Sequence, residues 1–302
     1  MVGWAALILG IALTTAWFAG MVFSDRWYWS QWLLWMTGLS LIPSGGLLLI
    51  GHWLLAQRVR IYAIGLMLIG PALWASGLIG THQIDPKPTS ESIRILQWAA
   101  GPVIGTPEAF ATFVVNNNAD VSIVHGGHRA ASSAAYRTWT HDRQVAIRGA
   151  FLISSRLPIH RLQTLIWADN ITLVLLELHP PDAAPIRMVL ADLPSSPQRS
   201  RSQVAQRVHK VLADLPGTID IILGDFNMTN DSWHLRHLTD NLHPMWSHCG
   251  VGWGGTYPRW LPIVQLDHVL STPERVQSMH VIAPAVGRHR AIVTEYVLKP
   301  AD

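Results

Sequence analysis

The sequence predicts three transmembrane helices followed by an α/β domain, and three observations carry that prediction. Residues 1–82 hold only four charged side chains, although the 302-residue chain has 22 Lys and Arg and 19 Asp and Glu. The remaining residues alternate short apolar runs with polar turns, as the strands of a layered α/β sandwich with largely antiparallel sheets do. The single cysteine, Cys249, excludes an internal disulfide framework and a cysteine-based metal cluster.

Three uncharged stretches near the start of the chain are each long enough to cross a bilayer as a helix. They cover about residues 2–23, 30–53 and 61–80, and a transmembrane helix needs about 20 apolar residues. Five aromatic residues between positions 27 and 35 are typical of side chains at a membrane interface. The first stretch has neither the basic start nor the cleavage site of a signal peptide. We therefore expect a membrane domain over residues 1–82.

The arginines between these stretches predict the orientation in the membrane. Arg58 and Arg60 lie between the second and third stretches. Arg26 lies between the first and second, but Asp25 stands beside it. Because cytoplasmic loops carry the excess of Arg and Lys, residues 54–60 are expected in the cytoplasm. This places the C-terminal domain in the periplasm, if the membrane is a bacterial inner membrane.

A polar linker that contains two prolines, residues 83–92, precedes the C-terminal domain, residues 93–302. Helix-like stretches fall at about 107–117 and 198–214, and the second has a basic exposed face. Apolar runs that predict strands cover residues 93–98, 120–125, 149–155, 162–168, 171–178, 186–193, 219–226, 266–271, 279–286 and 292–298.

Three motifs follow one another in the second half of the chain. Residues 222–227 read ILGDFN, residues 266–270 read LDHVL and residues 287–293 read GRHRAIV. With ISSRLPI at 153–159, this ordered series resembles the endonuclease/exonuclease/phosphatase family over about residues 92–299. The resemblance implies a four-layer sandwich in which two mostly antiparallel sheets are flanked by helices.

The same resemblance implies roles for four residues, because family members hydrolyse phosphodiesters or phosphomonoesters with Mg²⁺. Asp225 would be the base that activates water, and Asn227 would bind a phosphate oxygen. Asp267 would orient His289, and the pair would stabilise the transition state. These four residues are the candidate catalytic residues.

Four positions depart from the family pattern. Members usually have Asn where Ala99 stands, and Glu, the principal metal ligand, where Gly126 stands. They have His where Asp192 stands, and Asp where Arg288 precedes the last histidine. Mg²⁺ needs oxygen ligands, and a cation about 4 Å from the ion would repel it by roughly 4 kcal/mol. We therefore expect no bound metal or other cofactor, and loss of the family's metal-dependent catalysis.

Two interpretations of the altered site stay open. In one, Arg288 takes the place of the metal and binds an anion together with Asn227 and His289. In the other, the residues are scaffold, and an Arg288–Asp225 salt bridge fills the site.

Histidines and tryptophans outside the motifs are further candidates. His125 and His128 flank two glycines, and we expect ordinary surface residues there, with a rebuilt metal site as the alternative. Four tryptophans crowd one stretch and belong either to the core or to an apolar patch that docks on a partner or the bilayer. They are Trp233, Trp246, Trp253 and Trp260.

The function predicted from these residues is a membrane-anchored pseudoenzyme that serves as an accessory or structural subunit of a larger membrane complex. Its expected partners are the lipid bilayer and integral membrane proteins. The net charge of +3 is small and dispersed, so no nucleic acid partner is expected. The alternative is a Mg²⁺-dependent phosphodiesterase or phosphatase that acts on phosphate esters or lipid head groups at the membrane surface.

Overall fold

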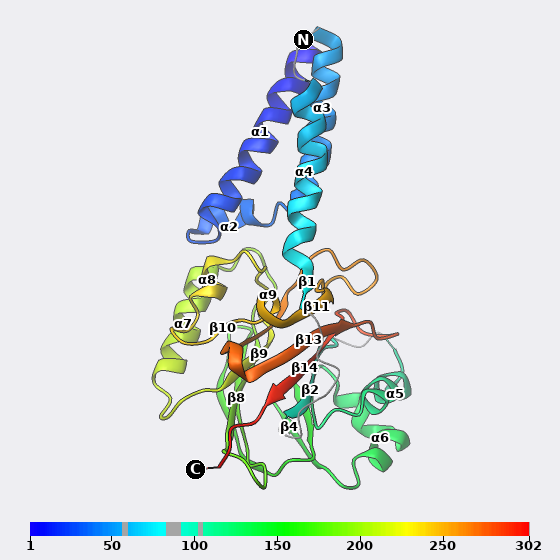
Figure 1. Cartoon of the computed structure of the whole chain (residues 1–302), viewed down its shortest axis with the longest axis vertical. Helices are drawn as coiled ribbons and strands as arrows, with labels where there is room; N and C mark the ends of the chain where they lie inside the picture. Colours follow the sequence, from blue (N-terminus) through cyan, green and yellow to red (C-terminus); the bar gives the residue numbers. More distant parts are fainter. Residues whose placement is uncertain (56–59, 83–91, 102–104, 302) are drawn as a thin grey trace. The chain divides into compact units, whose positions relative to one another are not determined.

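The computed structural model describes the chain except residues 56–59, 83–91, 102–104 and 302 (Figure 1). Almost all of the predicted linker, and Arg58 of the predicted cytoplasmic loop, lie outside the described residues. The chain forms two compact units. The helical unit consists of Met1–Leu78, Pro197–Gln206 and Thr229–Arg236, and the α/β unit consists of Ile79–Ser196, Arg207–Met228 and His237–Asp302.

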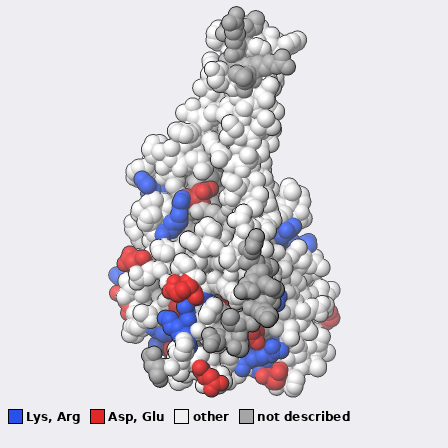
Figure 2. Space-filling view, in the orientation of Figure 1, with Lys and Arg blue, Asp and Glu red and all other residues white. Residues whose placement is uncertain are grey.

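The helical unit contains α1 (Val2–Phe23), α2 (Tyr28–Leu34), the 3₁₀ turn η1 (Gly38–Ser40), α3 (Leu41–Leu55) and α4 (Arg60–Leu78), with α8 (Trp233–Arg236) from later in the chain. By length and composition, two helical stretches of the described chain could cross a membrane, Val2–Phe23 and Gly38–Leu55. The apolar part of α4, Tyr62–Leu78, is shorter. Figure 2 shows that most charged side chains in view lie on the α/β unit.

The single helix predicted over residues 30–53 is wrong, because the helix stops after Leu34 and a new one starts at Gly38. Thr37 has extended backbone angles, φ −62° and ψ 161°, and separates the two. Pro43 falls in the first turn of α3, where its missing N–H leaves no helical hydrogen bond unmade. The second apolar stretch therefore covers Gly38–Leu55.

Small residues allow the long helices to pack closely side by side, with α3 against both α1 and α4 (Figure 1). A Cβ atom on Gly10 would lie 2.9 Å from Cγ of Leu48, and one on Gly70 would lie 2.6 Å from the carbonyl oxygen of Gly38. The Ser44 hydroxyl donates a hydrogen bond of 2.7 Å to the Gly10 carbonyl. Small residues and hydroxyls at helix contacts are typical of membrane helices.

In the described chain, the α/β unit has an eight-stranded and a six-stranded sheet. The larger sheet has the order β1 (Ile79–Thr81), β11 (Gly250–Trp253), β13 (Val276–Ile282), β14 (Ala291–Val297), β2 (Ser92–Ala99), β3 (Val121–His125), β5 (Phe151–Ser155) and β4 (Gln144–Arg148). The smaller has the order β10 (His243–Pro244), β12 (Asp267–Ser271), β9 (Ile221–Asp225), β8 (Ile186–Asp192), β7 (Ile171–Leu178) and β6 (Ile159–Ala168).

Both sheets are mixed. The pairs β2/β3, β11/β13 and β8/β9 are parallel, whereas the other described neighbours are antiparallel. Parallel neighbours need a crossover connection, and two of the three have a helix there. Helix α5 (Pro107–Asn117) connects β2 to β3, and α7 (Arg201–Ala213) connects β8 to β9. These two helices are the ones predicted at 107–117 and 198–214.

The main core lies between the two sheets. Ile95 of β2 belongs to the same buried cluster as Leu190 of β8 and Leu223 of β9. The next residue along β2, Leu96, points to the other face and packs in a cluster with Phe110 of α5. Two mixed sheets flanked by helices therefore form the α/β unit, and α5 and α6 (Ala134–Trp139) lie beside each other in Figure 1.

Candidate active site

Three aspartates lie on neighbouring strands at one end of the smaller sheet. β8 ends at Asp192 and β9 ends at Asp225, and these residues are partners in the parallel register. Asp267 begins β12 and is the antiparallel partner of Asp225. Asp225 and Asp267 are buried, and Asp192 is half-buried. The strand register thus brings two of the predicted residues together and adds a third carboxylate beside them.

His289, just before β14, joins this group. Its Nδ1 donates a hydrogen bond of 2.8 Å to Oδ2 of Asp267, and its Nε2 lies 3.7 Å from Oδ2 of Asp225. The Trp98 indole donates a hydrogen bond of 3.1 Å to the His289 carbonyl oxygen and so fixes the backbone there. The Asp267–His289 pair expected from the resemblance is present in the structure.

The turn after β9 places Asn227 in the same site. Asn227 has a left-handed backbone, φ 50°, and its backbone N–H donates to Oδ1 of Asp225 at 3.0 Å. Its side-chain amide donates to the Leu193 carbonyl at 2.8 Å. A Cβ atom at Gly224 would lie 1.8 Å from the carbonyl oxygen of Ala191, so only glycine fits before Asp225. The GDFN motif therefore specifies both the turn and its close approach to β8.

His125, at the end of β3, is also part of the site. Its Nε2 lies 3.2 Å from Oδ2 of Asp192. Burial lowers the pKa of His125, but the hydrogen bond and charge of Asp192 outweigh burial, and the net pKa is raised. The prediction of an ordinary surface residue is wrong for His125. His128 is exposed, with Nε2 3.1 Å from the Gly149 carbonyl, as predicted.

Two groups of the site, Asp225 and His289, have shifted pKa values. Burial raises the pKa of Asp225 to about 7, and the neighbouring Asp267 carboxylate adds to this effect, although His289 opposes it. Burial by itself would lower the pKa of His289, but the charges of Asp267 and Asp225 raise it to about 9. At neutral pH the imidazole of His289 is therefore protonated, and Asp225 exchanges a proton readily.

The donor set of this cluster fits a divalent cation. Asp225 and Asp267 each offer a carboxylate oxygen, and these oxygens and a ring nitrogen of His289 lie within 4.8 Å of one another. Oδ1 of Asp267 is buried and has no hydrogen-bond partner among the described residues. Carboxylate oxygens are the ligands that Mg²⁺ and Mn²⁺ prefer, and the free oxygen of Asp267 suits such an ion.

Arg288 is not brought beside the cluster. Its side chain is exposed and passes over Gly101, and its backbone N–H donates to the Ala100 carbonyl at 3.0 Å. In the described part of the chain Asp225 lies within ion-pair distance of His289, and the predicted Arg288–Asp225 salt bridge is not formed. Arg288 and His289 lie in the bend before β14, where His289 is buried and Arg288 is exposed.

The two other positions that differ from the family pattern lie at strand ends and carry no side chain that can bind a metal. Ala99 ends β2, and Gly126 follows β3 with φ 75°. A Cβ atom at Gly126 would lie 2.6 Å from the Gly101 carbonyl oxygen, so the backbone occupies the space that a longer side chain would need.

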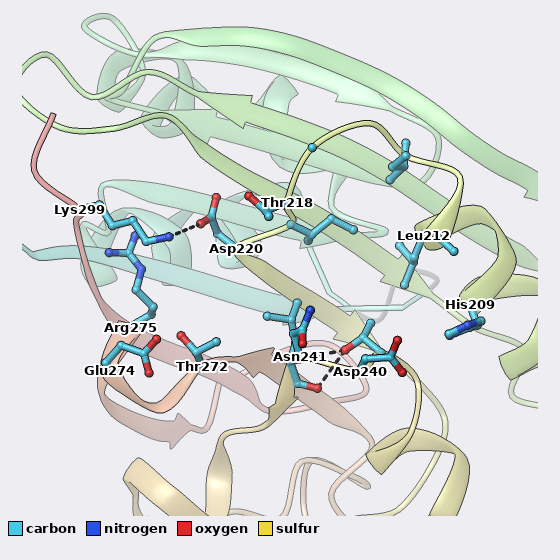
Figure 3. A pocket seen from close by; sticks show the side chains of 16 residues that line it. His209, Leu212, Thr218, Asp220, Asp240, Asn241, Thr272, Glu274, Arg275 and Lys299 are labelled. Atoms are coloured by element: carbon cyan, nitrogen blue, oxygen red, sulfur yellow. Dashed lines mark hydrogen bonds and ion pairs between the residues drawn. The ribbon is translucent and has the colours of Figure 1, made fainter. Parts of the chain in front are cut away.

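A cavity of about 410 Å³ lies at the other end of β9, where the strand begins (Figure 3). Its walls include Asp220, Arg275 and Lys299, and none of the clustered aspartates lines it. Nζ of Lys299 lies 3.5 Å from Oδ1 of Asp220, and Arg275 donates to the Tyr296 hydroxyl. The cavity does not contain the residues of the family motifs, and we assign the candidate site to the aspartate cluster.

Comparison with known proteins identifies the family of the chain. A family model described as the Endonuclease/Exonuclease/phosphatase family matches residues 78–289. An endonuclease/exonuclease/phosphatase family protein from Bacteroides thetaiotaomicron is similar in structure, with a TM-score of 0.54, 14% identity and coverage of 70% of this chain and 99% of that one. A 3′-5′ exonuclease from Neisseria meningitidis has a TM-score of 0.50 and 13% identity, and the match covers 68% of this chain and 100% of that one.

These two similarities show the fold alone, and no curated protein sequence matches the chain. The family model, however, covers well over half of the sequence and includes the strands that carry Asp225 and Asp267. The chain therefore belongs to the endonuclease/exonuclease/phosphatase family.

Proposed function

We propose that this protein is a membrane-anchored hydrolase of phosphate esters that works with a divalent cation. The observation that carries the proposal is the cluster of Asp192, Asp225 and Asp267 with His289 at one end of the smaller sheet. Burying charged groups costs several kcal/mol each, so a pure scaffold has no reason to bury Asp225 and Asp267 side by side next to Asp192. Members of the family are typically metal-dependent.

An exchange of two side chains supports retained chemistry. The family pattern has a carboxylate after the second strand and an imidazole on the strand where Asp192 stands. Here β3 ends with the imidazole of His125 and β8 ends with the carboxylate of Asp192, and the two groups lie 3.2 Å apart. The site thus keeps an imidazole and a carboxylate, but each stands on the strand where the family pattern has the other. Asp192 therefore supplies the carboxylate that is missing at Gly126.

The residues of the site divide the reaction among them. Asp225, whose pKa is raised to about 7 by burial, accepts the proton of the attacking water. His289, held by Asp267, donates a hydrogen bond from Nε2 to a phosphoryl oxygen as charge develops there. The aspartates would hold the divalent cation, which when bound supplies positive charge to the phosphoryl group.

The prediction of an inactive site depended in part on repulsion between the positive charge of Arg288 and a bound metal ion. Arg288 is exposed and forms no ion pair with Asp225 or Asp267 in the described chain, so its charge is not buried with theirs. The absence of ligand groups at Ala99 and Gly126 favours the second candidate, an inactive accessory subunit with integral membrane proteins as partners.

We place the helical unit in a membrane, with α4 as a third span beside α1 and α3. The end of α1 and the end of α4 both contact the same segment of the unit. The Ser24 hydroxyl donates to the Asp231 carbonyl at 2.7 Å, and the Asn230 amide donates to the Gly77 carbonyl at 2.9 Å. Three crossings put these two ends on one side and the N-terminus on the other. From the loop arginines we propose a bacterial inner membrane with the α/β unit in the periplasm.

A turnover assay of the full chain in nanodiscs tests the proposal. We expect hydrolysis of bis(p-nitrophenyl) phosphate or p-nitrophenyl phosphate only with Mg²⁺ or Mn²⁺. Asp225→Asn and His289→Gln should each lower turnover by about 100-fold. The exposed Asp142→Asn should not change it. Absence of turnover with every cation would exclude the hydrolase and favour the accessory subunit.

A further inference from the structure

The loop over residues 255–264, here called the Trp260 loop, exposes an apolar surface. Trp260 is 76% exposed and Leu261 is 50% exposed, and Tyr257 on the same loop is 39% exposed. Large apolar side chains at adjacent positions are rarely left in water without a partner.

Hydrogen bonds on both sides of these side chains hold the loop in place. The Trp253 indole donates to the Pro262 carbonyl at 2.8 Å. Nε of Arg259 donates to the Gly287 carbonyl at 3.0 Å, and Nε of Arg290 donates to the Arg259 carbonyl at 3.0 Å. The backbone therefore fixes Trp260 and Leu261 in their outward position.

The loop is joined to the point where the chain leaves its last apolar helix. Helix α4 ends at Leu78, and β1 begins at the next residue, Ile79. Ile79 pairs with Trp253 of β11, the residue whose indole bonds to the Trp260 loop. Ile79 is itself 49% exposed. If α4 crosses a bilayer, the strand that follows it starts at the bilayer surface and has the loop beside it.

The other side of the loop touches the candidate site. The ring centroids of Tyr257 and His289 lie 4.9 Å apart. The Arg259 N–H donates to the carbonyl of Arg288 at 2.9 Å, which joins the loop to the segment that carries the exposed Arg288. An exposed arginine beside exposed aromatic side chains matches the phosphate groups and the interfacial zone of a phospholipid bilayer.

We propose that the Trp260 loop docks into the surface of the bilayer that anchors the chain, so that the candidate site faces phosphate esters carried by lipid head groups. Tryptophan favours the head-group region, where its ring is apolar and its N–H is hydrated. Arg288 binds a lipid phosphate next to the loop. The docking rests on the anchoring proposed above, and the lipid substrate rests on the proposed hydrolysis.

Depth-dependent quenching in nanodiscs tests the docking directly. The full chain carries a single introduced cysteine, labelled with an environment-sensitive fluorophore, in discs with or without spin-labelled phosphatidylcholine. Burial raises the pKa of Cys249 to about 12, so the native thiol stays unlabelled at neutral pH, and the unsubstituted chain checks this. The labelled variants are Trp260→Cys in the loop, Ile8→Cys in α1, and Trp167→Cys on β6, which is 72% exposed and serves as the matched control.

We expect the spin label to remove about half of the fluorescence at position 8, which lies within a helix that crosses the bilayer. We expect a similar loss at position 260, because interfacial side chains lie at the acyl boundary. The signal at position 167 should not change. Quenching at position 8 without quenching at 260 would overturn the docking and leave the anchoring intact. No quenching at position 8 would overturn the anchoring and the docking with it. Equal quenching at 167 and 260 would also overturn the docking, because the loop would then be no closer to the lipid than the control position.

The lipid substrate has its own readout. Trp260→Ser should lower hydrolysis of bilayer-borne phosphate esters about tenfold and leave hydrolysis of soluble p-nitrophenyl phosphate unchanged. Loss of both activities to the same extent would overturn the role of the loop in substrate access. Absence of both activities in the unsubstituted chain would instead be the failure of the proposed hydrolysis.

Discussion

Asp192 is the residue on which the proposed cation site depends most, because Gly126 offers no carboxylate. Its carboxylate lies beside Asp225 in the parallel register and against His125. Asp192→Asn keeps the shape but removes the charge, and we expect Mn²⁺ to bind about tenfold more weakly, a loss of about 1.4 kcal/mol. Titration calorimetry of the full chain measures this, with Asp142→Asn as the control. Unchanged affinity would show that Asp192 is not part of the site.

His268 gives the chain a pH-dependent stability. Burial lowers the pKa of His268 to about 4, while Nε2 donates to the Met228 carbonyl at 2.8 Å. The folded state therefore resists protonation, whereas the unfolded chain takes up a proton near pH 6.5. This contribution to stability is complete above pH 6.5 and is lost as the pH falls towards 4, by about 3 kcal/mol.

Chemical unfolding at pH 7.5 and pH 4 compares the chain with His268→Gln, which cannot be protonated. The wild-type chain should lose about 3 kcal/mol more than the variant between these pH values. Parallel losses in both proteins would mean that His268 is protonated in the folded state.

Some site residues are predictable from local sequence and others are not. Asp225 and Asp267 stand in short motifs next to apolar strands, and the structure places them together. His125 also ends an apolar strand, and this is a signal of the same kind, but its partner Asp192 is 67 positions away on another sheet. The outward direction of the Arg288 side chain depends on the local backbone conformation, which the residue type does not specify.

At the scale of the elements, the turn between α1 and α2 accepts hydrogen bonds from the start of α8 through the buried Asp25. Asp25 is 2% exposed, and its Oδ1 accepts hydrogen bonds from the N–H groups of Trp233 and His234 at 2.8 and 3.3 Å. The other carboxylate oxygen, Oδ2, accepts a hydrogen bond from the Ser232 hydroxyl. Asp25 therefore satisfies the free N–H groups at the start of α8.

Gln31 in α2 does the same for the start of α7. Its Nε2 donates to the Pro197 carbonyl at 2.8 Å, and its Oε1 accepts from the Arg201 N–H at 3.0 Å. In the sequence, the partners of Gln31 follow the site strand β8, and the partners of Asp25 follow the site strand β9.

Asp25→Ala should destabilise the helical unit by about 3 kcal/mol, because it leaves buried donors without a partner. Asp25→Asn keeps the acceptor oxygen and should cost less. Hydrogen exchange at residues 233–235 should be faster in Asp25→Ala, measured alongside thermal unfolding in nanodiscs. Exchange rates equal to those of the wild-type chain would show that Asp25 does not hold α8.

Some helices and strands are likewise predictable from local sequence, and others are not. Helices α5 and α7 and the buried strands were predictable, because their apolar residues recur with a regular period. β4 was not, because it is an edge strand with mostly exposed side chains and has no buried face to create a pattern. The contacts of Asp25 and Gln31 join residues more than 160 positions apart, which no local period encodes.

For the whole molecule, the helical unit is more than a tether, since it includes residues 197–206 and 229–236 from the C-terminal half. A chain that starts at Ile79 loses Asp25 and Gln31 and leaves these two segments without their partners. Limited proteolysis should cut the truncated chain within them at least about tenfold faster than the full chain, because local opening then costs about 1.4 kcal/mol less. Equal cleavage rates would mean that the α/β unit holds these segments by itself.

The central claim is that the buried aspartate cluster binds a divalent cation and hydrolyses phosphate esters. Turnover of bis(p-nitrophenyl) phosphate by the full chain, measured against increasing Mn²⁺ and in parallel with Asp225→Asn, tests it most directly. The predicted result is a rate that saturates with the cation and falls by about 100-fold in the variant. A rate that stays at background at every cation concentration, or that is equal in both proteins, would contradict the claim.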